Sequence, residues 1–293
     1  KLKEYEQADL VKLEKGYREF MNDERFSYAS NGKVTLRLAK LKAIYLNEID
    51  KAIGLLQTLI NKQAGGNRTL KAKARLALAD YYLLKGQHAK AQLTYAKVEN
   101  MFEGHPLGNK ATYRKAKLSF YKGNFDWAGS QLKILKGATS KMIANNALEL
   151  DMLIKDNRGL DTTEVPLQIY ARADMYLFKN QYEEAQLRLD SILTQFPEHN
   201  LTDEVYFAKA RIAKENRNYD SAVNLLKKIY SNYGNDILAD NALYKAARIY
   251  QRQLDDQQKA KKLYEEIVTE YGGSIYQLKA RKAYRKLRGD RIN

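Results

Sequence analysis

The chain has 293 residues, of which 44% are hydrophobic and 29% charged, and it contains no cysteine. The hydrophobic content is enough for a core, but a mean hydropathy of −0.62 indicates that this core is thin. Without cysteine the chain can form no disulfide, thiolate metal site or cysteine nucleophile. No apolar run approaches the ~18 residues that a membrane span needs, so we expect no membrane-spanning segment.

Lysine and arginine number 51 against 35 for aspartate and glutamate, so the formal net charge is +16 at pH 7. A charge of this size suits nucleic acid, anionic lipid or an acidic protein as a partner. The lysines are spread over the whole chain, however, and a solvated basic surface explains them as well. The sequence begins at Lys1 without a signal-like segment, so we expect a mature form or a piece of a longer chain.

The first stretch, residues 1–32, carries an imperfect helical stripe of apolar and aromatic residues. It shares no pattern with the rest of the chain. We therefore expect an N-terminal helix or the remnant of an earlier repeat. The stripe consists of Leu2, Tyr5, Leu13, Tyr17 and Phe20.

From residue 33 onward one block recurs six times: an alanine, then Tyr or Leu four residues later, then Leu, Val or Ile three residues further. Spacings of four and three place each trio on one face of a helix. The alanines lie 39, 37, 57, 37 and 38 residues apart, which predicts a stacked repeat of helix pairs. The trios are Ala52-Leu56-Leu59, Ala91-Tyr95-Val98, Ala128-Leu132-Leu135, Ala185-Leu189-Ile192, Ala222-Leu226-Ile229 and Ala260-Tyr264-Ile267.

Two further positions recur before each alanine. Five residues earlier stands a turn-permissive or polar residue, which predicts a tight turn between two helices: Asn47, Gly86, Gly123, Asn180, Arg217 and Asp255. Twelve residues earlier stands a small residue that allows close helix packing: Ala79, Ala116, Ala173 and Ala210. The last unit has Ala247, one place out of register, which predicts a turn one residue longer. The first unit has Lys40 with Ala39 beside it.

The spacing of 57 residues exceeds one repeat by about one helix. We assign that helix to Ser140–Asn157 and a polar linker to Arg158–Val165, before Pro166 opens a new helix. The predicted organisation is residues 1–32, repeats 1–3 over 33–137, a spacer over 138–165, repeats 4–6 over 166–273, and a basic capping helix over 274–293. We expect a bend or limited hinge at the spacer, with protease cleavage first within 157–165.

The arrangement resembles the tetratricopeptide repeat (TPR). The residues that carry the resemblance are clearest in Ala79-Tyr82-Gly86-Ala91-Tyr95-Val98 and Ala173-Tyr176-Tyr182-Ala185-Ile192-Pro197. The resemblance implies an all-α, right-handed α-solenoid of antiparallel helix pairs. The long period and the link at Gln195-Phe196-Pro197 are similar to a TPR subgroup of bacterial envelope proteins, such as the outer-membrane assembly lipoprotein and the Tol-Pal coordinator.

The sequence offers little for catalysis. The histidines, His88, His105 and His199, have no second histidine or carboxylate at ligand spacing. No glycine-rich phosphate loop, nucleophile elbow or zinc-protease motif occurs. We expect no enzyme, no catalytic residue, no metal site and no cofactor.

In TPR proteins the first helix of each pair lines a concave groove. The resemblance places there a series of aromatic and charged residues, which suits a peptide with apolar anchors and acidic flanks. The residues are Tyr113, Lys117, Phe120, Tyr170, Asp174, Phe178, Phe207, Arg211, Lys214, Tyr244 and Arg248. Leu76, Asp80 and Asp174 depart from the Lys and Asn clamp of chaperone-binding TPR proteins, which disfavours that partner class.

The C-terminal helix carries a second candidate surface. Its apolar stripe, Tyr276, Ala280, Ala283 and Leu287, can close the array, while cations cover the remainder. Cations stabilise a helix C-terminus in any case, but this patch is denser than that role needs. The basic patch consists of Lys279, Lys282, Arg285 and Lys286.

Together these features predict a non-enzymatic scaffold that binds a protein or peptide in its groove. The subgroup resemblance and the missing cysteines indicate the periplasm or cell envelope, with the cytoplasm as the other location. Membrane association would come only through a partner or an anchor outside this sequence. The alternative is a polyanion-binding module for nucleic acid, envelope polymer or lipid headgroups, although we expect a protein rather than nucleic acid.

Overall fold

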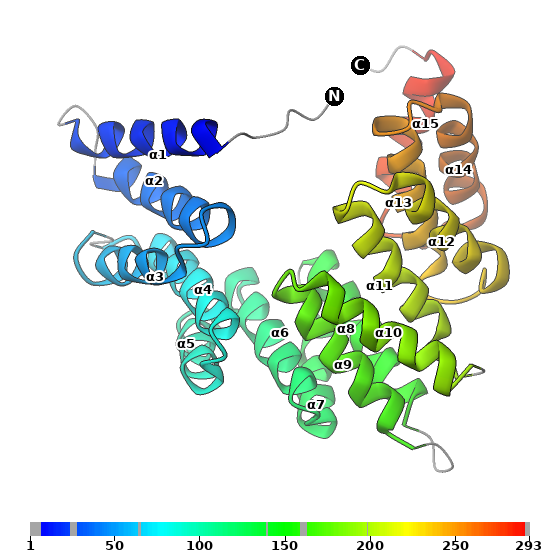
Figure 1. Cartoon of the computed structure of the whole chain (residues 1–293), viewed down its shortest axis with the longest axis horizontal. Coiled ribbons are helices and arrows are strands. Elements are labelled where there is room, and N and C mark those ends of the chain that lie inside the picture. The colour runs from blue at the N-terminus through cyan, green and yellow to red at the C-terminus, as the bar shows by residue number, and fades with distance from the viewer. Residues whose placement is uncertain are drawn as a thin grey trace. The chain divides into compact units, whose positions relative to one another are not determined.

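The computed structural model describes residues 7–23, 28–63, 66–138, 140–158, 163–197 and 199–290 (Figure 1). Every regular element in these ranges is a helix, so the predicted all-α class is confirmed. The chain forms two compact units, residues 1–118 and 119–293, and each is described by itself.

The described part of unit 1 contains five complete α-helices and most of a sixth. Two of its helices end in a π-helical turn, labelled η1 and η2. The elements are α1 (Gln7–Asn22), α2 (Tyr28–Lys40), η1 (Leu41–Tyr45), α3 (Ile49–Thr58), η2 (Leu59–Gln63), α4 (Arg68–Leu84), α5 (His88–Met101) and most of α6 (Pro106–Tyr121). Within the unit α2 packs against α3, α3 against α4, and α4 against α5.

Unit 2 begins within α6 and contains the longer run of hairpins. From α9 to α15 each helix packs against the next one in the chain. The elements are α7 (Phe125–Leu135), α8 (Lys141–Asp156), α9 (Val165–Phe178), α10 (Tyr182–Gln195), α11 (Thr202–Glu215), α12 (Tyr219–Asn232), α13 (Ala239–Arg252), α14 (Gln257–Glu270) and α15 (Gln277–Arg288). The helix α8 lies where the sequence predicts a spacer helix, and Pro166 lies in the first turn of α9.

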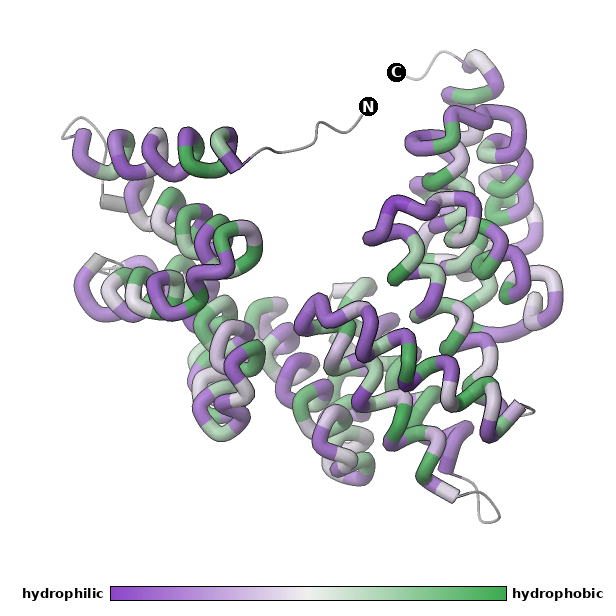
Figure 2. Tube along the Cα trace, in the orientation of Figure 1, coloured by the Kyte–Doolittle hydropathy of each residue, from purple (hydrophilic) through white to green (hydrophobic). Residues whose placement is uncertain are grey.

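The repeated block forms the core of every hairpin. All eighteen residues of the six trios are at most 2% exposed. The small residues of the facing helices are also buried, from Ala39 at 0% to Ala210 at 3%. Figure 2 shows that hydrophobic and hydrophilic residues are mixed along the helices. Alanine on one helix against alanine on the next lets the two backbones approach closely.

The turns within the hairpins follow the sequence prediction. Asn47, Gly86, Gly123, Asn180, Arg217 and Asp255 all have positive φ, between 53° and 77°. In the second hairpin the amide of Gln87 donates to the carbonyl of Tyr82 at 2.8 Å, which closes the end of α4. This is the geometry of a helix that ends in a left-handed residue, where glycine and asparagine are favoured.

The first and last hairpins each contain one extra residue, and the chain accommodates it in two ways. In the last hairpin the closing bond runs from the amide of Asp256 to the carbonyl of Tyr250, one residue further than in the four middle hairpins, so the predicted longer turn is confirmed. In the first hairpin the extra residue lies in the π-helical turn η1, and Glu48 donates its amide to Lys42. That turn buries Ala39 and leaves Lys40 exposed.

Two of the histidines, His105 and His199, lie in links between hairpins and have a structural role there. The ring of His105 lies 5.1 Å from that of Phe102, and its Nδ1 accepts the amide of Leu107 at 3.1 Å. His199 repeats this arrangement, since its Nδ1 accepts the amide of Leu201 at 3.2 Å. Both histidines therefore shape the start of the next helix.

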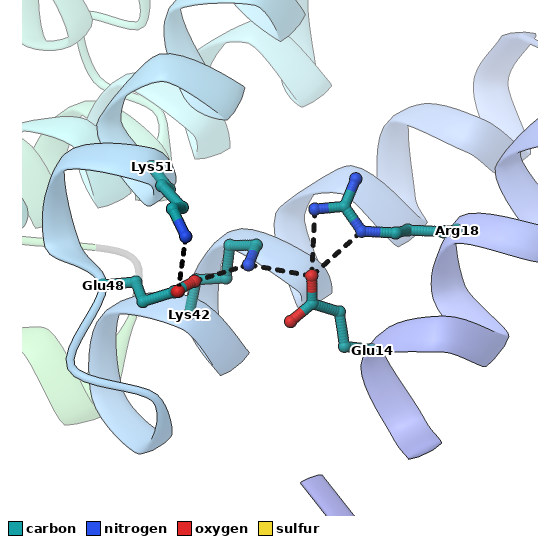
Figure 3. A network of polar contacts seen from close by, with 5 residues as sticks. All are labelled: Glu14, Arg18, Lys42, Glu48 and Lys51. Atoms are coloured by element: carbon teal, nitrogen blue, oxygen red, sulfur yellow. Dashed lines mark hydrogen bonds and ion pairs between the residues drawn. The ribbon is translucent and has the colours of Figure 1, made fainter. Parts of the chain in front are cut away.

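The helix α1 is attached to unit 1 by charge rather than by a buried apolar face. None of its residues is buried. Lys42 lies between two carboxylates, with its Nζ 2.8 Å from Glu14 of α1 and 2.5 Å from Glu48 (Figure 3). Arg18 adds a second cation to Glu14, and Lys51 adds one to Glu48, each within 2.9 Å. This chain of ion pairs joins α1 to η1 and α3.

Candidate functional site

The first helices of two hairpins in unit 2 form a cleft of about 390 Å³, which we call the α11–α13 cleft. On α11 the spacing of four and three residues places Phe207, Arg211 and Lys214 on one face. On α13 the same spacing aligns Arg248 and Arg252 with the cleft. Its lining residues are Phe207, Ala210, Arg211, Lys214, Glu215, Leu226, Lys245, Arg248, Ile249, Arg252 and Gln253.

The cleft has an apolar floor and cationic walls. The floor consists of Ala210, Leu226 and Ile249, each at most 3% exposed. The walls present exposed cations, two from α11 and three from α13: Arg211, Lys214, Lys245, Arg248 and Arg252. A ligand in this cleft would meet hydrophobic surface below and positive charge on both sides.

Few carboxylates in the described chain compensate these cations. Glu215 pairs with its neighbour Lys214 at 2.9 Å. Arg211 reaches Asp174 of α9 only at 4.0 Å. Because these contacts lie at the edge of the cleft or are long, its walls keep a net positive charge.

Lys245 lies at the centre of this cluster. Its Nζ is 4.0 Å from the centroid of the Phe207 ring, a cation–π contact. The residue as a whole is exposed, while its ammonium group lies over the Phe207 ring and near three other cations. Burial, together with repulsion from Arg211, Lys214 and Arg248, lowers the pKa of Lys245 to about 8, although Glu149 opposes the shift.

The spacer helix α8 contributes Glu149 at the amino-terminal end of the same α13 face. Its carboxylate accepts a hydrogen bond from Asn241 at 3.3 Å, and Asn241 lies one turn before Lys245. Burial raises the pKa of Glu149, and this effect exceeds the opposing attraction of Lys245 and the hydrogen bond from Asn241. Asn241 also accepts a hydrogen bond from Tyr276 at 3.2 Å, whose ring stacks on Tyr244 at 4.4 Å.

Of the residues that the sequence assigns to the groove, Phe207, Arg211, Lys214 and Arg248 line the α11–α13 cleft. The others in unit 2 lie beside it or in the packing between helices. Asp174 faces Arg211, and Tyr244 packs on Tyr276. Tyr170 is 9% exposed, and the ring of Phe178 lies 6.3 Å from that of Tyr121.

Three of the predicted groove residues lie on α6. Phe120 is fully buried, and its ring packs on Phe125 at 5.6 Å, so a partner could not contact it in this conformation. Tyr113 and Lys117 belong to unit 1 and are partly exposed. The candidate site therefore consists of residues of unit 2.

The sequence interpretation missed Lys245, Arg252 and Glu149. A signal for Arg252 existed, because it follows Arg248 by four residues on one helix face. Lys245 lies three residues before Arg248 and could have been found in the same way. Glu149 gives no such signal, since its contact with Asn241 spans 92 residues.

In the predicted basic patch on α15, one of the four cations, Arg285, forms an ion pair with a carboxylate. Lys279, Lys282 and Lys286 are exposed. Arg285 pairs with Asp290 at 3.2 Å, and Arg288 pairs with the same carboxylate at 2.5 Å. The helix ends at Gly289 in a left-handed conformation, with Asp290 folded back on the last turn.

The described residues hold no group of three or more His, Asp or Glu side chains arranged to bind a metal ion. None of their helices is both long and apolar enough to cross a membrane.

The fold and the cleft define a repeat protein built from helical hairpins. The family model of the tetratricopeptide repeat matches residues 241–274, which cover most of α13, α14 and the link after them. The match confirms the resemblance seen in the sequence for this segment, and the preceding hairpins share its pattern of buried trios and left-handed turns.

Solved structures show similar chains at low identity. A tetratricopeptide repeat protein from Parabacteroides merdae is 14% identical, with 96% of this chain and 93% of that chain covered at a TM-score of 0.41. The TPR domain of P58(IPK) is also 14% identical, with 97% and 75% covered at a TM-score of 0.35. No curated protein sequence matches the chain.

Proposed function

We propose that this protein is a non-enzymatic scaffold that binds a partner protein or peptide in the α11–α13 cleft. The observation that carries the proposal is the combination of an apolar floor with cationic walls, aligned along the first helices of two successive hairpins. Tetratricopeptide repeats present first-helix faces as extended binding surfaces, because each repeat contacts only its neighbours and leaves one face open.

A protein fits this cleft better than a uniform polyanion. Phe207 and the floor at Leu226 and Ile249 offer apolar contacts that a phosphate backbone cannot use. Aromatic and arginine side chains in a recess are typical of the residues that dominate protein interfaces. The cations then select acidic partners and speed their association.

The proposed location is the periplasm or cell envelope of a bacterium. The similarity of the long repeats to envelope TPR proteins and the absence of cysteine support it. Fractionation of the source cells, with the protein detected by antibody, should recover it with periplasmic or envelope markers. Recovery with cytoplasmic markers would contradict this location.

The scaffold proposal is tested by affinity purification of partners from an extract of the source organism. Phe207→Ala and Arg248→Ala should each deplete the captured partner, while the double variant Lys279→Ala/Lys282→Ala on α15 should not. The partner should remain bound at moderate salt, because apolar contacts contribute to the complex. Capture that is unaffected by both cleft substitutions would refute binding in this cleft.

A second function, polyanion binding, is favoured by one observation: Lys279, Lys282 and Lys286 are exposed together on α15. Counterion release then requires affinity to fall steeply with salt concentration. Under this alternative the α15 double variant should weaken binding of a single-stranded oligonucleotide or heparin, and Phe207→Ala should leave it unchanged. Dependence on Phe207 would exclude the alternative.

A further inference from the structure

The charges in the α11–α13 cleft restrict what its partner can be. Arg211 and Lys214 stand on the α11 wall, and Lys245, Arg248 and Arg252 stand on the α13 wall. The ion pairs described for the cleft cations, Lys214 with Glu215 and Arg211 with Asp174, both involve the α11 wall. A ligand that carries carboxylates on two of its sides can pair with cations of both walls at the same time.

The structure also places a carboxylate carried by a helix at one end of this face. The helix α8 places Glu149 beside Asn241 of α13 and close enough to Lys245 to oppose the lowering of its pKa. At its other end the backbone carbonyl of Asp156 accepts a hydrogen bond from Asn200 at 3.3 Å, just before α11. A carboxylate carried on a helix is therefore already accommodated at the amino-terminal end of the cationic face.

Helical geometry predicts the sequence spacing at which two side chains of a bound helix would face the two cationic walls. Successive residues of an α-helix are separated by about 100°, so residues three before and three after a given position lie about 60° to either side of it. An apolar residue that points to the floor would then have its flanking carboxylates directed at the two walls. In an extended strand, by contrast, successive side chains alternate between only two opposite faces.

We propose that the α11–α13 cleft binds an amphipathic helix of a partner protein in which one apolar residue is flanked by acidic residues three positions before and three positions after it. The apolar side chain packs on Ala210, Leu226 and Ile249. One acidic side chain pairs with Arg211 and the other with Arg248. This assignment rests on the proposed function and adds the conformation and charge pattern of the partner.

Binding also relieves the electrostatic cost at Lys245. Its ammonium group lies over the Phe207 ring and is repelled by Arg211, Lys214 and Arg248, while Glu149 attracts it. Carboxylates on both walls favour the charged form of this lysine. Affinity should therefore be higher at pH 7, where Lys245 is largely protonated, than at pH 9. Glu149 and the cations Arg211, Lys214 and Arg248 are the charged groups that face Lys245.

The probe is a fluorescein-labelled, alanine-based helical peptide with Leu at its centre and Glu three residues before and after it. A control peptide has the same composition, but its two Glu residues stand at the third and the seventh position after the Leu. Both carboxylates then lie on the same side of the Leu on the helix surface. Circular dichroism checks that the two peptides are equally helical. Fluorescence anisotropy on the full chain then measures the affinity for each.

The symmetric peptide should bind at least about fivefold more tightly than the control peptide, and Arg211→Gln and Arg248→Gln should each weaken it roughly 3- to 10-fold. The matched variant Lys282→Gln on α15 should change its affinity less than about twofold. Equal binding of the two peptides would overturn the proposal. Displacement of the peptide by single-stranded DNA, with no effect of either arginine substitution, would overturn it in favour of polyanion binding.

The outcome is separable from that of the proposed function. If neither peptide binds but Phe207→Ala still depletes the natural partner, the acidic-helix inference is wrong and the scaffold proposal stands. If the partner is also captured equally well by Phe207→Ala and Arg248→Ala, both are wrong.

Discussion

Lys42 shows how a single buried cation can hold a helix that has no buried face. Its side chain is 3% exposed, and burial alone would lower its pKa. Hydrogen bonds to Glu14 and Glu48 outweigh that effect and raise the pKa. The hydrogen bond from Lys42 in turn lowers the pKa of both carboxyls, that of Glu48 to about 2. The charged states of Glu14 and Lys42 are thus tied to the docking of α1.

We predict that Lys42→Met releases α1 while the rest of unit 1 stays folded. Removing one partner of a largely buried ion pair costs on the order of 1–3 kcal/mol, so amide exchange in residues 7–22 should accelerate about tenfold or more. Hydrogen exchange measured by mass spectrometry checks this. Lys51→Met is the control, because its side chain is 65% exposed and its ion pair with Glu48 adds little. Unchanged protection of α1 in Lys42→Met would show that other contacts hold it.

Glu204 makes the stability of unit 2 decrease with rising pH, whereas a carboxylate in an ordinary ion pair makes stability increase with rising pH. Burial raises its pKa well above 4.5, and the neighbouring Asp203 carboxyl adds to the shift. A group whose pKa is raised on folding stabilises the protein below its unfolded pKa and loses that contribution as the pH rises through the folded pKa. Asp203 is itself 2% exposed, and burial raises its pKa too.

We therefore predict that the urea concentration at the unfolding midpoint of unit 2 decreases as the pH is raised from about 5 to about 8. The substitution Glu204→Gln should make this decrease smaller. The glutamine remains neutral throughout and keeps the size of the side chain. Trp127, the one tryptophan of the chain, lies on α7 in unit 2 and reports its unfolding by fluorescence. The control Glu183→Gln alters a carboxylate in the first turn of α10. An identical pH dependence in wild type and Glu204→Gln would contradict the assignment.

At the scale of the helices, the links between hairpins restrict which residue can stand at a position, as the turns within hairpins do. At Gly108, in the first turn of α6, an added Cβ would lie 1.9 Å from the carbonyl oxygen of Phe102. The end of α5 therefore approaches the start of α6 so closely that only glycine fits. Gly54, within α3, has no heavy atom within 4 Å of the same position.

These two glycines form a matched pair for substitution by alanine. Gly108→Ala should destabilise the protein by roughly 1–3 kcal/mol, because the backbone of the link must shift. Gly54→Ala should stabilise it by about 0.5–1 kcal/mol, since alanine is favoured within a helix and nothing obstructs it. Urea unfolding followed by far-ultraviolet circular dichroism measures both. Destabilisation by Gly54→Ala, or none by Gly108→Ala, would contradict this account of the packing.

The parts of the fold that the sequence predicted are those that depend on local spacing. Helix pairs, buried trios and left-handed turns follow from residues less than one repeat apart, so Ala222, Leu226 and Arg217 could be placed by counting. The π-helical turn at Leu41–Tyr45 could not, because an extra residue can be absorbed in a turn or in a helix. The predicted cleavage at 157–165 includes residues 159–162, which lie outside the described residues, so it stays a prediction.

At the scale of the whole molecule, the candidate site combines local and distant contributions. The cations of α11 and α13 were partly predicted, because each set lies on one helix face. The contact of Glu149 with Asn241 was not, because it depends on how the spacer helix packs against a hairpin far along the chain. Sequence periodicity therefore predicts the faces of a repeat protein better than what lies against them.

The most direct measurement of the central claim is site-specific photo-crosslinking in the source organism. A benzoylphenylalanine residue at Lys214, in the α11–α13 cleft, is compared with one at Lys262, an exposed lysine of α14 that does not line the cleft. We predict a discrete crosslinked partner from position 214, absent from position 262 and lost when Arg248→Glu is added. Equal adducts from both positions, or adducts at 214 that persist with Arg248→Glu, would contradict the claim that this cleft is where the partner binds.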